Sequence, residues 1–166
     1  MTDSIPFVPY KLFLLYVEPI SALVGAFYAG IRPSEYLGLL TLGHTIDKST
    51  AATPPTATLM SLYQLSNLYL LFALNEHLVL SSTSSLKTWR RLLFCLLVAD
   101  LGHLATMAPL GRDVYWRVWD WNAMVWGSVG FVYLGAATRI CFLAGVGMKD
   151  PRTQGTSADK QVCRRE

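Results

Sequence analysis

Four long apolar segments, separated by polar connectors, dominate the hydrophobic pattern of this chain of 166 residues. Each approaches or exceeds the roughly 20 residues that a helix needs to cross about 30 Å of hydrocarbon. Backbone N–H and C=O groups in lipid must be satisfied within the segment, so we expect helices. The pattern predicts an all-α protein, a four-helix transmembrane bundle with spans at about 10–31, 59–80, 92–109 and 123–148.

The polar segments complete the predicted domain organisation. Residues 1–148 form one membrane domain, and residues 149–166 form a polar tail that we expect to be disordered. The longest connector is 32–58. Its stretch Ser49–Thr58 is rich in Thr, Ala and Pro and predicts a loop, because Pro54 and Pro55 cannot continue a helix. The first span exceeds the apolar part of a typical signal peptide, and no Lys or Arg precedes Lys11, so we expect a retained span.

Charge is scarce and unevenly placed. Only 15% of the residues are charged, against about 25% in soluble domains. An even number of spans puts both termini and the 81–91 connector on one side, with nine basic residues: Lys11, Lys87, Arg90, Arg91, Lys149, Arg152, Lys160, Arg164 and Arg165. The other side has four: Arg32, Lys48, Arg112 and Arg117. The positive-inside rule therefore predicts that both termini are cytosolic.

Several classes of function are disfavoured by what the sequence lacks. No basic stripe interleaves with polar contact residues, so we expect no nucleic-acid partner. The three cysteines form no C-x-x-C pair, so neither a zinc site nor a disulfide framework is indicated. Cys163 is followed by Arg164, Arg165 and Glu166, which argues against a prenyl anchor. We expect no metal and no organic cofactor.

The informative residues are the ionisable ones inside the spans: Glu18, Glu76, His77, Asp100, His103 and Arg139. A charged group at the middle of a membrane helix costs about 2.5–3.5 kcal/mol, so such residues usually face the bundle interior and have partners. By helical rise, the three acids and Arg139 lie at similar depth in the cytosolic half. We infer that at least one carboxyl is protonated at neutral pH, and a protonated carboxyl can act as a proton donor.

Helical spacing places other side chains beside these groups. Asp100 and His103 are i,i+3 and share a face, and Pro19 frees a backbone carbonyl one turn before it. Two stripes predict a cavity with acids at one end and aromatic walls, which would stabilise a cation by roughly 0.5–2 kcal/mol per ring. The stripes are Leu65, Tyr69, Phe72 and Glu76 in the second span, and Asn122, Trp126 and Tyr133 in the fourth.

Structural interpretations of the same residues stay open. Arg139 and the three acids are equally consistent with a polar clamp that holds the four helices together. His103 alone is more typical of a helix-to-helix hydrogen bond than of a catalyst, and His77, near the interface, is expected to reach toward water. The tryptophans Trp116, Trp119 and Trp121 fit an interfacial belt as well as a substrate contact.

A resemblance adds to this reading. Four runs resemble a family of small fungal four-span membrane proteins of unassigned activity: Tyr16–Ala22, Phe72–Glu76, Ala99–His103, and Trp121–Tyr133 with its continuation to Arg139. More loosely, the chain resembles integral membrane cyclases and isomerases of fungal terpenoid and meroterpenoid pathways. That resemblance implies carbocation chemistry started by an acidic residue. The expected location is the endoplasmic reticulum, the default for lipophilic chemistry in fungi. The Asp-rich DDxxD motif of soluble terpene synthases is absent, which disfavours metal-dependent ionisation of a diphosphate.

The resulting hypothesis is a membrane-embedded cyclase or isomerase of fungal secondary metabolism, with a lipophilic isoprenoid-type substrate. Glu76 or Asp100 would protonate an alkene or epoxide, Glu18 and Arg139 would set the protonation state of that acid, and His103 would relay the proton. The predicted substrate-binding residues are Tyr69, Phe72, Asn75, Asn122, Trp126 and Tyr133. The competing hypotheses are a non-catalytic scaffold, lipid-binding or accessory protein, and, third, a transporter, for which no inverted repeat is visible. The bilayer is the expected environment, and the oligomeric state stays open.

Overall fold

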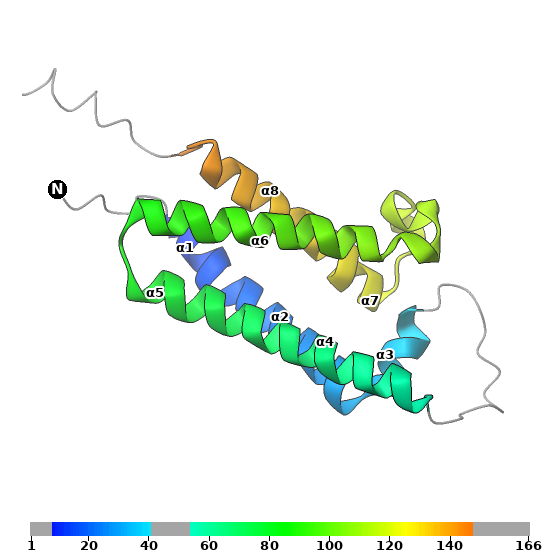
Figure 1. Cartoon of the computed structure of the whole chain (residues 1–166). Coiled ribbons are helices and arrows are strands. Elements are labelled where there is room, and N and C mark those ends of the chain that lie inside the picture. Colours follow the sequence, from blue (N-terminus) through cyan, green and yellow to red (C-terminus); the bar gives the residue numbers. More distant parts are fainter. Residues whose placement is uncertain (1–7, 41–53, 148–166) are drawn as a thin grey trace, which may run out of the picture.

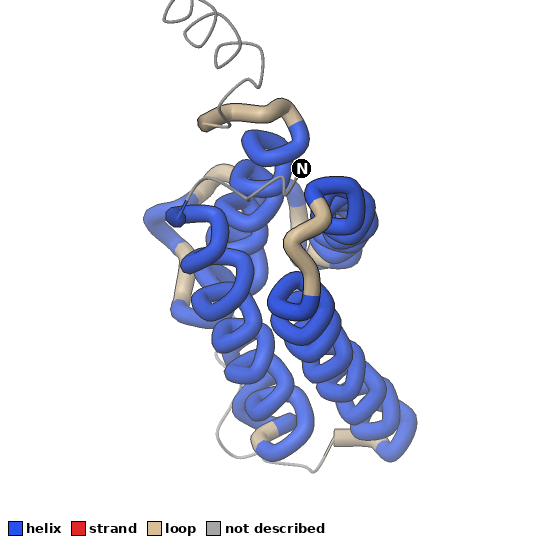
Figure 2. The backbone as a smooth tube through the Cα atoms, turned by 90° about the vertical axis from the view of Figure 1, so that its left-hand side faces the viewer, coloured by secondary structure: helices blue, strands red, loops and turns tan. Residues whose placement is uncertain are grey.

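The computed structural model describes residues 8–40 and 54–147, which are helices joined by short connections, with no strand among them (Figure 2). Four of the helices are long and apolar enough to cross a membrane: Val8–Ile31, Thr56–Ser82, Leu86–Leu110 and Ala123–Leu143. The prediction of an all-α protein with four such helices is therefore confirmed. The predicted tail, 149–166, lies outside the described residues.

The first two spans contain π-helical turns between α-helical segments. Span one is built from α1 (Val8–Leu12), the π-helical turn η1 (Phe13–Val17) and α2 (Glu18–Ile31). Span two is built from α4 (Thr56–Leu74), the π-helical turn η3 (Asn75–Val79) and α5 (Leu80–Ser82).

Of the other two spans, only span four contains a π-helical turn. Span three is the uninterrupted helix α6 (Leu86–Thr106), followed by the short turn η4 (Ala108–Leu110). Span four begins with α7 (Ala123–Val125), continues through the π-helical turn η7 (Trp126–Gly130) and ends with α8 (Phe131–Leu143). Two 3-10 turns, η5 (Arg112–Tyr115) and η6 (Val118–Asp120), connect spans three and four.

The predicted connectors need two corrections. The 32–58 connector contains the helix α3, Pro33–Leu40, whose first turn accommodates Pro33 because that position needs no N–H donor. Of the predicted loop Ser49–Thr58, residues 49–53 lie outside the described residues, and α4 already begins at Thr56. The 81–91 connector is shorter than predicted, since Ser85 caps α6 by accepting a hydrogen bond from the Thr88 N–H, at 3.4 Å. Span four ends earlier than predicted, before Gly145 and Gly147, which have positive φ values.

The four spans run alternately up and down and associate as two pairs. Span one packs along span two, through α2 and α4, and span three packs along span four, through α6 and α8. The start of α1, the connection between α5 and α6, and the end of α8 lie together at one end of the bundle (Figure 1). We call this the termini end. The far end carries α3, α7 and the η5–η6 connection.

Apolar clusters join the two pairs at both ends. At the termini end, Trp89 stacks on Phe142 with 5.8 Å between ring centroids, and the Tyr10 hydroxyl donates to the Val146 carbonyl at 2.9 Å. The buried members of this cluster are Tyr10, Leu14, Leu80, Trp89, Leu93, Leu96 and Phe142. At the far end, the two clusters comprise Met107, Val114, Val125 and Val129, and Ala29, Tyr36 and Leu62.

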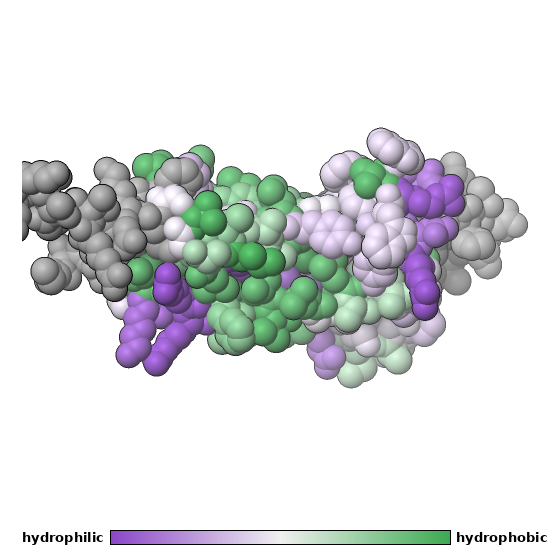
Figure 3. Space-filling view, turned by 90° about the horizontal axis from the view of Figure 1, so that it is seen from above, coloured by the Kyte–Doolittle hydropathy of each residue, from purple (hydrophilic) through white to green (hydrophobic). Residues whose placement is uncertain are grey.

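Large apolar side chains also cover the outside of the spans. Ile20, Leu68 and Leu101 are 59%, 60% and 57% exposed. On the face seen in Figure 3, hydrophobic residues cover the middle of the molecule and hydrophilic ones lie toward its ends. A soluble protein rarely exposes so continuous an apolar surface. The arrangement is that of a multi-pass membrane protein.

Candidate functional site

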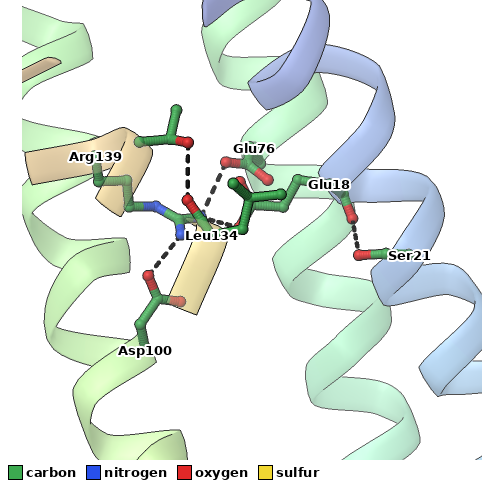
Figure 4. Close-up of polar contacts among 7 residues, drawn as sticks. Glu18, Ser21, Glu76, Asp100, Leu134 and Arg139 are labelled. Atoms are coloured by element: carbon green, nitrogen blue, oxygen red, sulfur yellow. Dashed lines mark hydrogen bonds and ion pairs between the residues drawn. The ribbon is translucent and has the colours of Figure 1, made fainter. Parts of the chain in front are cut away.

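Arg139 lies at the centre of a buried ion cluster to which every span contributes one charged side chain. Its guanidinium contacts Asp100 Oδ2 through Nη1 at 2.6 Å, and Glu18 Oε1 and Glu76 Oε1 through Nη2 at 2.6 and 3.1 Å. Figure 4 shows the three carboxyls approaching the guanidinium from different helices. The predicted convergence of the three acids with Arg139 is confirmed, and we call these four residues the Arg139 cluster.

The cluster is almost completely removed from solvent. Arg139 and Glu76 are 0% exposed, and Glu18 and Asp100 are 5% and 6% exposed. Three buried side-chain atoms have no hydrogen-bond partner among the described residues: Glu18 Oε2, Glu76 Oε2 and Arg139 Nε. Three ionised carboxylates around one guanidinium would leave two net negative charges in an apolar bundle, which is strongly unfavourable. At least one carboxyl must therefore hold a proton.

Small and aromatic neighbours shape the space around the guanidinium. Gly135 lies one turn before Arg139, and a Cβ atom there would come within 2.8 Å of Glu18 Oε1 and 2.9 Å of Arg139 Nη1. Only glycine leaves room for the ion pairs at this position. On another side, the Phe72 ring centroid lies 5.5 Å from Arg139 Cζ, within the range of a cation–π interaction. Phe72 thus lies beside the cluster, as the sequence predicted.

Two histidines satisfy backbone carbonyls in the π-helical turns. In such a turn the hydrogen bond runs to residue i−5, as from the Glu18 N–H to the Phe13 carbonyl, and carbonyls are left for other donors. His77 Nδ1 donates to the Leu15 carbonyl in η1 at 2.7 Å, one turn before Pro19. His103 Nε2 donates to the Ser128 carbonyl in η7 at 3.1 Å.

These contacts decide between the two interpretations of each histidine. The expectation that His77 reaches toward water was wrong, because its ring crosses to span one and bonds a carbonyl there. The interpretation of His103 as a helix-to-helix hydrogen bonder is confirmed. A proton relay between Asp100 and His103 stays a prediction, and the hydrogen bond that His103 makes is with Ser128.

The predicted substrate-binding residues are dispersed. Tyr69 packs in the interior, with its ring centroid 6.3 Å from that of His103. Asn75 is exposed on the outside of span two. Trp126 and Tyr133 are 51% and 39% exposed, and the Tyr133 hydroxyl donates to the Tyr115 carbonyl at 3.4 Å. Only Phe72 and Tyr69 among these face the bundle interior.

Asn122 has a structural position at the far end. Its Oδ1 accepts from the Val125 N–H at 2.9 Å and so caps α7, and its Nδ2 donates to the Leu39 carbonyl at 2.5 Å.

The prediction that one cavity would be lined by both aromatic stripes was wrong. An open apolar groove of about 320 Å³ does lie on span four, but its lining contains no charged residue: Trp126, Gly127, Gly130, Phe131 and Leu134.

Comparison with known proteins bears on this arrangement. A family model described as a domain of unknown function, DUF7704, matches residues 2–149. The chain belongs to the DUF7704 family. Neither the curated proteins nor the solved structures contain a significant match to it.

The DUF7704 match spans all four membrane helices and the whole Arg139 cluster. Within the described part of this domain, no group of three or more His, Cys, Asp or Glu side chains is placed to hold a metal ion. The three acids that meet are instead bridged by the Arg139 guanidinium.

The histidine contacts yield a first testable prediction for this DUF7704 domain. Replacing His103 with Leu removes the donor to the Ser128 carbonyl, and an unsatisfied buried carbonyl costs about 1–3 kcal/mol. We expect a lower Tm in detergent for His103→Leu, and partial recovery in His103→Gln, whose amide can donate. An unchanged Tm for His103→Leu would mean that the contact contributes nothing to stability.

Proposed function

We propose that this protein is a membrane-embedded cyclase or isomerase that acts by acid catalysis on a lipophilic, isoprenoid-type substrate. The observation that carries the proposal is that three carboxyls surround one guanidinium in the Arg139 cluster, buried between apolar helices. A protonated carboxyl held away from water is a strong candidate for general acid catalysis. The excess of basic residues in the sequence on the side of the termini supports a cytosolic orientation of both termini. The proposed location is the endoplasmic reticulum.

The chemistry requires one proton and no cofactor. A carboxylic acid transfers its proton to an alkene carbon or an epoxide oxygen, so that a C–H or O–H bond forms while the π bond or a C–O bond breaks. The resulting carbocation rearranges or closes a ring and then loses a proton to the same carboxylate. Substrate and product have the same atoms, and the acid is restored.

Asp100 is the acid that a substrate would reach most easily. Its side chain is 8% exposed, the most of the three acids, whereas that of Glu76 is 0% exposed. Arg139 contacts Asp100 Oδ2 at 2.6 Å, so the carboxylate that remains after proton transfer has a cation beside it. Glu76 Oε1 lies farther from the guanidinium, at 3.1 Å, and Glu76 is the alternative donor. The Phe72 ring centroid, 5.5 Å from Arg139 Cζ, would place an aromatic face beside the cluster for a developing carbocation.

A non-catalytic membrane protein is the second candidate, and one observation favours it. Each of the four spans contributes one charged side chain, and the Arg139 side chain that the three carboxyls surround is 0% exposed. Such an arrangement also describes a polar clamp that fixes the order and depth of the helices. The protein would then act as a scaffold, lipid binder or accessory subunit.

Conservative substitutions separate the two candidates. Membranes from a host that expresses the full chain are supplied with prenylated substrates, and the products are analysed by mass spectrometry. We expect Asp100→Asn to lose roughly 100-fold in product formation or more, because general acid catalysis contributes about 10²–10⁴-fold. The control is Asp113→Asn, the same chemical change at a side chain that is 75% exposed in the far-end connection.

The Tm in detergent provides the second readout. A loss of product with little change in Tm supports the enzyme and the role of Asp100. If Asp100→Asn and Glu76→Gln keep the wild-type product profile, the acid assignment is wrong. If both variants unfold and the wild type converts none of the substrates, the cluster is a clamp and the second candidate stands.

A further inference from the structure

Three carboxamide side chains lie on the outside of span two, within the length that crosses the membrane. Gln64, Asn67 and Asn75 are all exposed, and none of their side chains forms a hydrogen bond with another of the described residues. The fourth carboxamide of the described residues, Asn122, is fully engaged as a cap. Span two is also the least buried of the four, with 11% of its most apolar window inside the molecule.

The three carboxamides share one face of the helix. At 100° per residue they fall within an arc of about 80°. The residues of α4 that pack into the bundle, such as Leu62 and Ala73, lie on the opposite side. Gln64, Asn67 and Asn75 therefore form a polar stripe that points away from every other span.

This polar stripe lies at hydrocarbon depth. Thr56–Ser82 has 27 residues, or about 40 Å of helix, and the three carboxamides lie roughly 12, 16 and 28 Å from its start. The about 30 Å of hydrocarbon centred on the helix includes all three. An amide without a partner in lipid is costly, so such groups usually hydrogen-bond across a helix interface.

Hydroxyl groups at comparable positions behave differently. Ser61 Oγ donates to the Ala57 carbonyl at 3.0 Å, and Thr138 Oγ1 donates to the Leu134 carbonyl at 2.8 Å. Each exposed hydroxyl is thus satisfied by its own helix, as is usual for Ser and Thr in membranes. Within residues 8–40 and 54–147 the carboxamides of the polar stripe have no such solution, and a second molecule could supply their partners.

We propose that the polar stripe is a homodimer interface, at which span two of one chain pairs with span two of a second copy. Two copies inserted in the same orientation are related by a two-fold axis along the membrane normal. Gln64, Asn67 and Asn75 then meet their own counterparts at the same depth. A carboxamide is both donor and acceptor, so identical groups satisfy each other. A helix from another protein would need matching polar groups at all three depths.

Cysteine cross-linking in membranes tests the proposal. The native cysteines Cys95, Cys141 and Cys163 are first replaced by alanine in the full chain. Leu71→Cys then places a thiol in the middle of the polar stripe, at a position that is 51% exposed. The matched control is Leu101→Cys, on span three, which is 57% exposed. We expect oxidation to give a covalent dimer of twice 18.5 kDa for Leu71→Cys and not for Leu101→Cys.

The carboxamides themselves are tested by a triple variant, Gln64→Leu with Asn67→Leu and Asn75→Leu. Each interhelical hydrogen bond in a membrane is worth roughly a threefold change in the dissociation constant. We expect the dimer, followed by energy transfer between labelled chains in lipid vesicles, to weaken by about 30-fold. Helix content by circular dichroism should stay unchanged, because leucine at a lipid-facing site leaves the fold intact.

Three results would overturn the interface. One is equal dimer yield from the two cysteine positions, which would indicate random collision. Another is a cross-link from Leu71→Cys only to a species other than the dimer, which would assign the polar stripe to a different partner. The last is a triple variant that keeps the wild-type dissociation constant.

Discussion

Arg139→Leu should unfold at a much lower temperature than the wild type, with a loss of about 3–5 kcal/mol. The substitution removes the only cation of the Arg139 cluster and leaves three carboxyls facing one another in an apolar interior. Removing one partner of a buried ion pair destabilises a protein far more than replacing the whole pair with apolar residues, because the remaining charged partner stays desolvated. Thermal unfolding in detergent, followed by circular dichroism, measures the change.

Arg32→Ala is the matched control for this prediction. Arg32 also pairs with a glutamate, Glu35, at 2.9 Å, but both side chains are 53% exposed. Exposed pairs contribute about 0–1 kcal/mol, so Arg32→Ala should have nearly the wild-type Tm. Converting the whole cluster to amides, with Arg139→Gln, Glu18→Gln, Glu76→Gln and Asp100→Asn together, should recover part of the loss. Equal Tm values for Arg139→Leu and Arg32→Ala would mean that the cluster does not hold the spans together.

Gly135→Ala should be the second most damaging change, although it adds a single methyl group. That methyl carbon would lie 2.8 Å from Glu18 Oε1 and 2.9 Å from Arg139 Nη1, closer than nonbonded carbon and oxygen or nitrogen atoms approach. The ion pairs must shift to accommodate it, and overpacking of this kind costs about 1–3 kcal/mol. We expect a clear drop in Tm and, if the cluster is catalytic, a parallel drop in product formation.

Gly102→Ala serves as the control for the glycine prediction. Gly102 is also inside a membrane helix, two residues after Asp100, and a Cβ atom there meets nothing within 4 Å. Alanine favours a helix over glycine by about 1 kcal/mol, so Gly102→Ala should be neutral or mildly stabilising. A Gly135→Ala protein as stable as Gly102→Ala would contradict the close packing around the guanidinium.

The sequence was sufficient to predict that the buried charges meet. Glu18, Glu76, Asp100 and Arg139 each lie in a segment too apolar to hold a lone charge, so lipid leaves them no partner except one another. The number of spans followed from the same contrast between apolar runs and polar connectors. Segment ends were less predictable, because α3 and the first turn of α6 are polar enough to resemble loop.

The direction in which a helical stripe faces was beyond sequence reasoning. Trp126 and Tyr133 share a stripe in an ideal helix, yet both lie on the outer surface. In lipid the outside of a helix is as apolar as its inside, so hydrophobicity does not distinguish the two faces. The π-helical turn η7 also interrupts the 3.6-residue period from which the stripe of Asn122, Trp126 and Tyr133 was predicted, because a π-helical turn contains more residues. Apart from Pro19, no residue pattern indicated such turns.

The order of the four charged residues along the chain has a consequence for biogenesis. Synthesis delivers Glu18, Glu76 and Asp100 to the bilayer first, and their counterion arrives only with the fourth span. A chain interrupted before Arg139 holds three acids without a base and has no means of neutralising them except protonation. We therefore expect a chain that lacks the fourth span to be less stable in the bilayer than one that includes it.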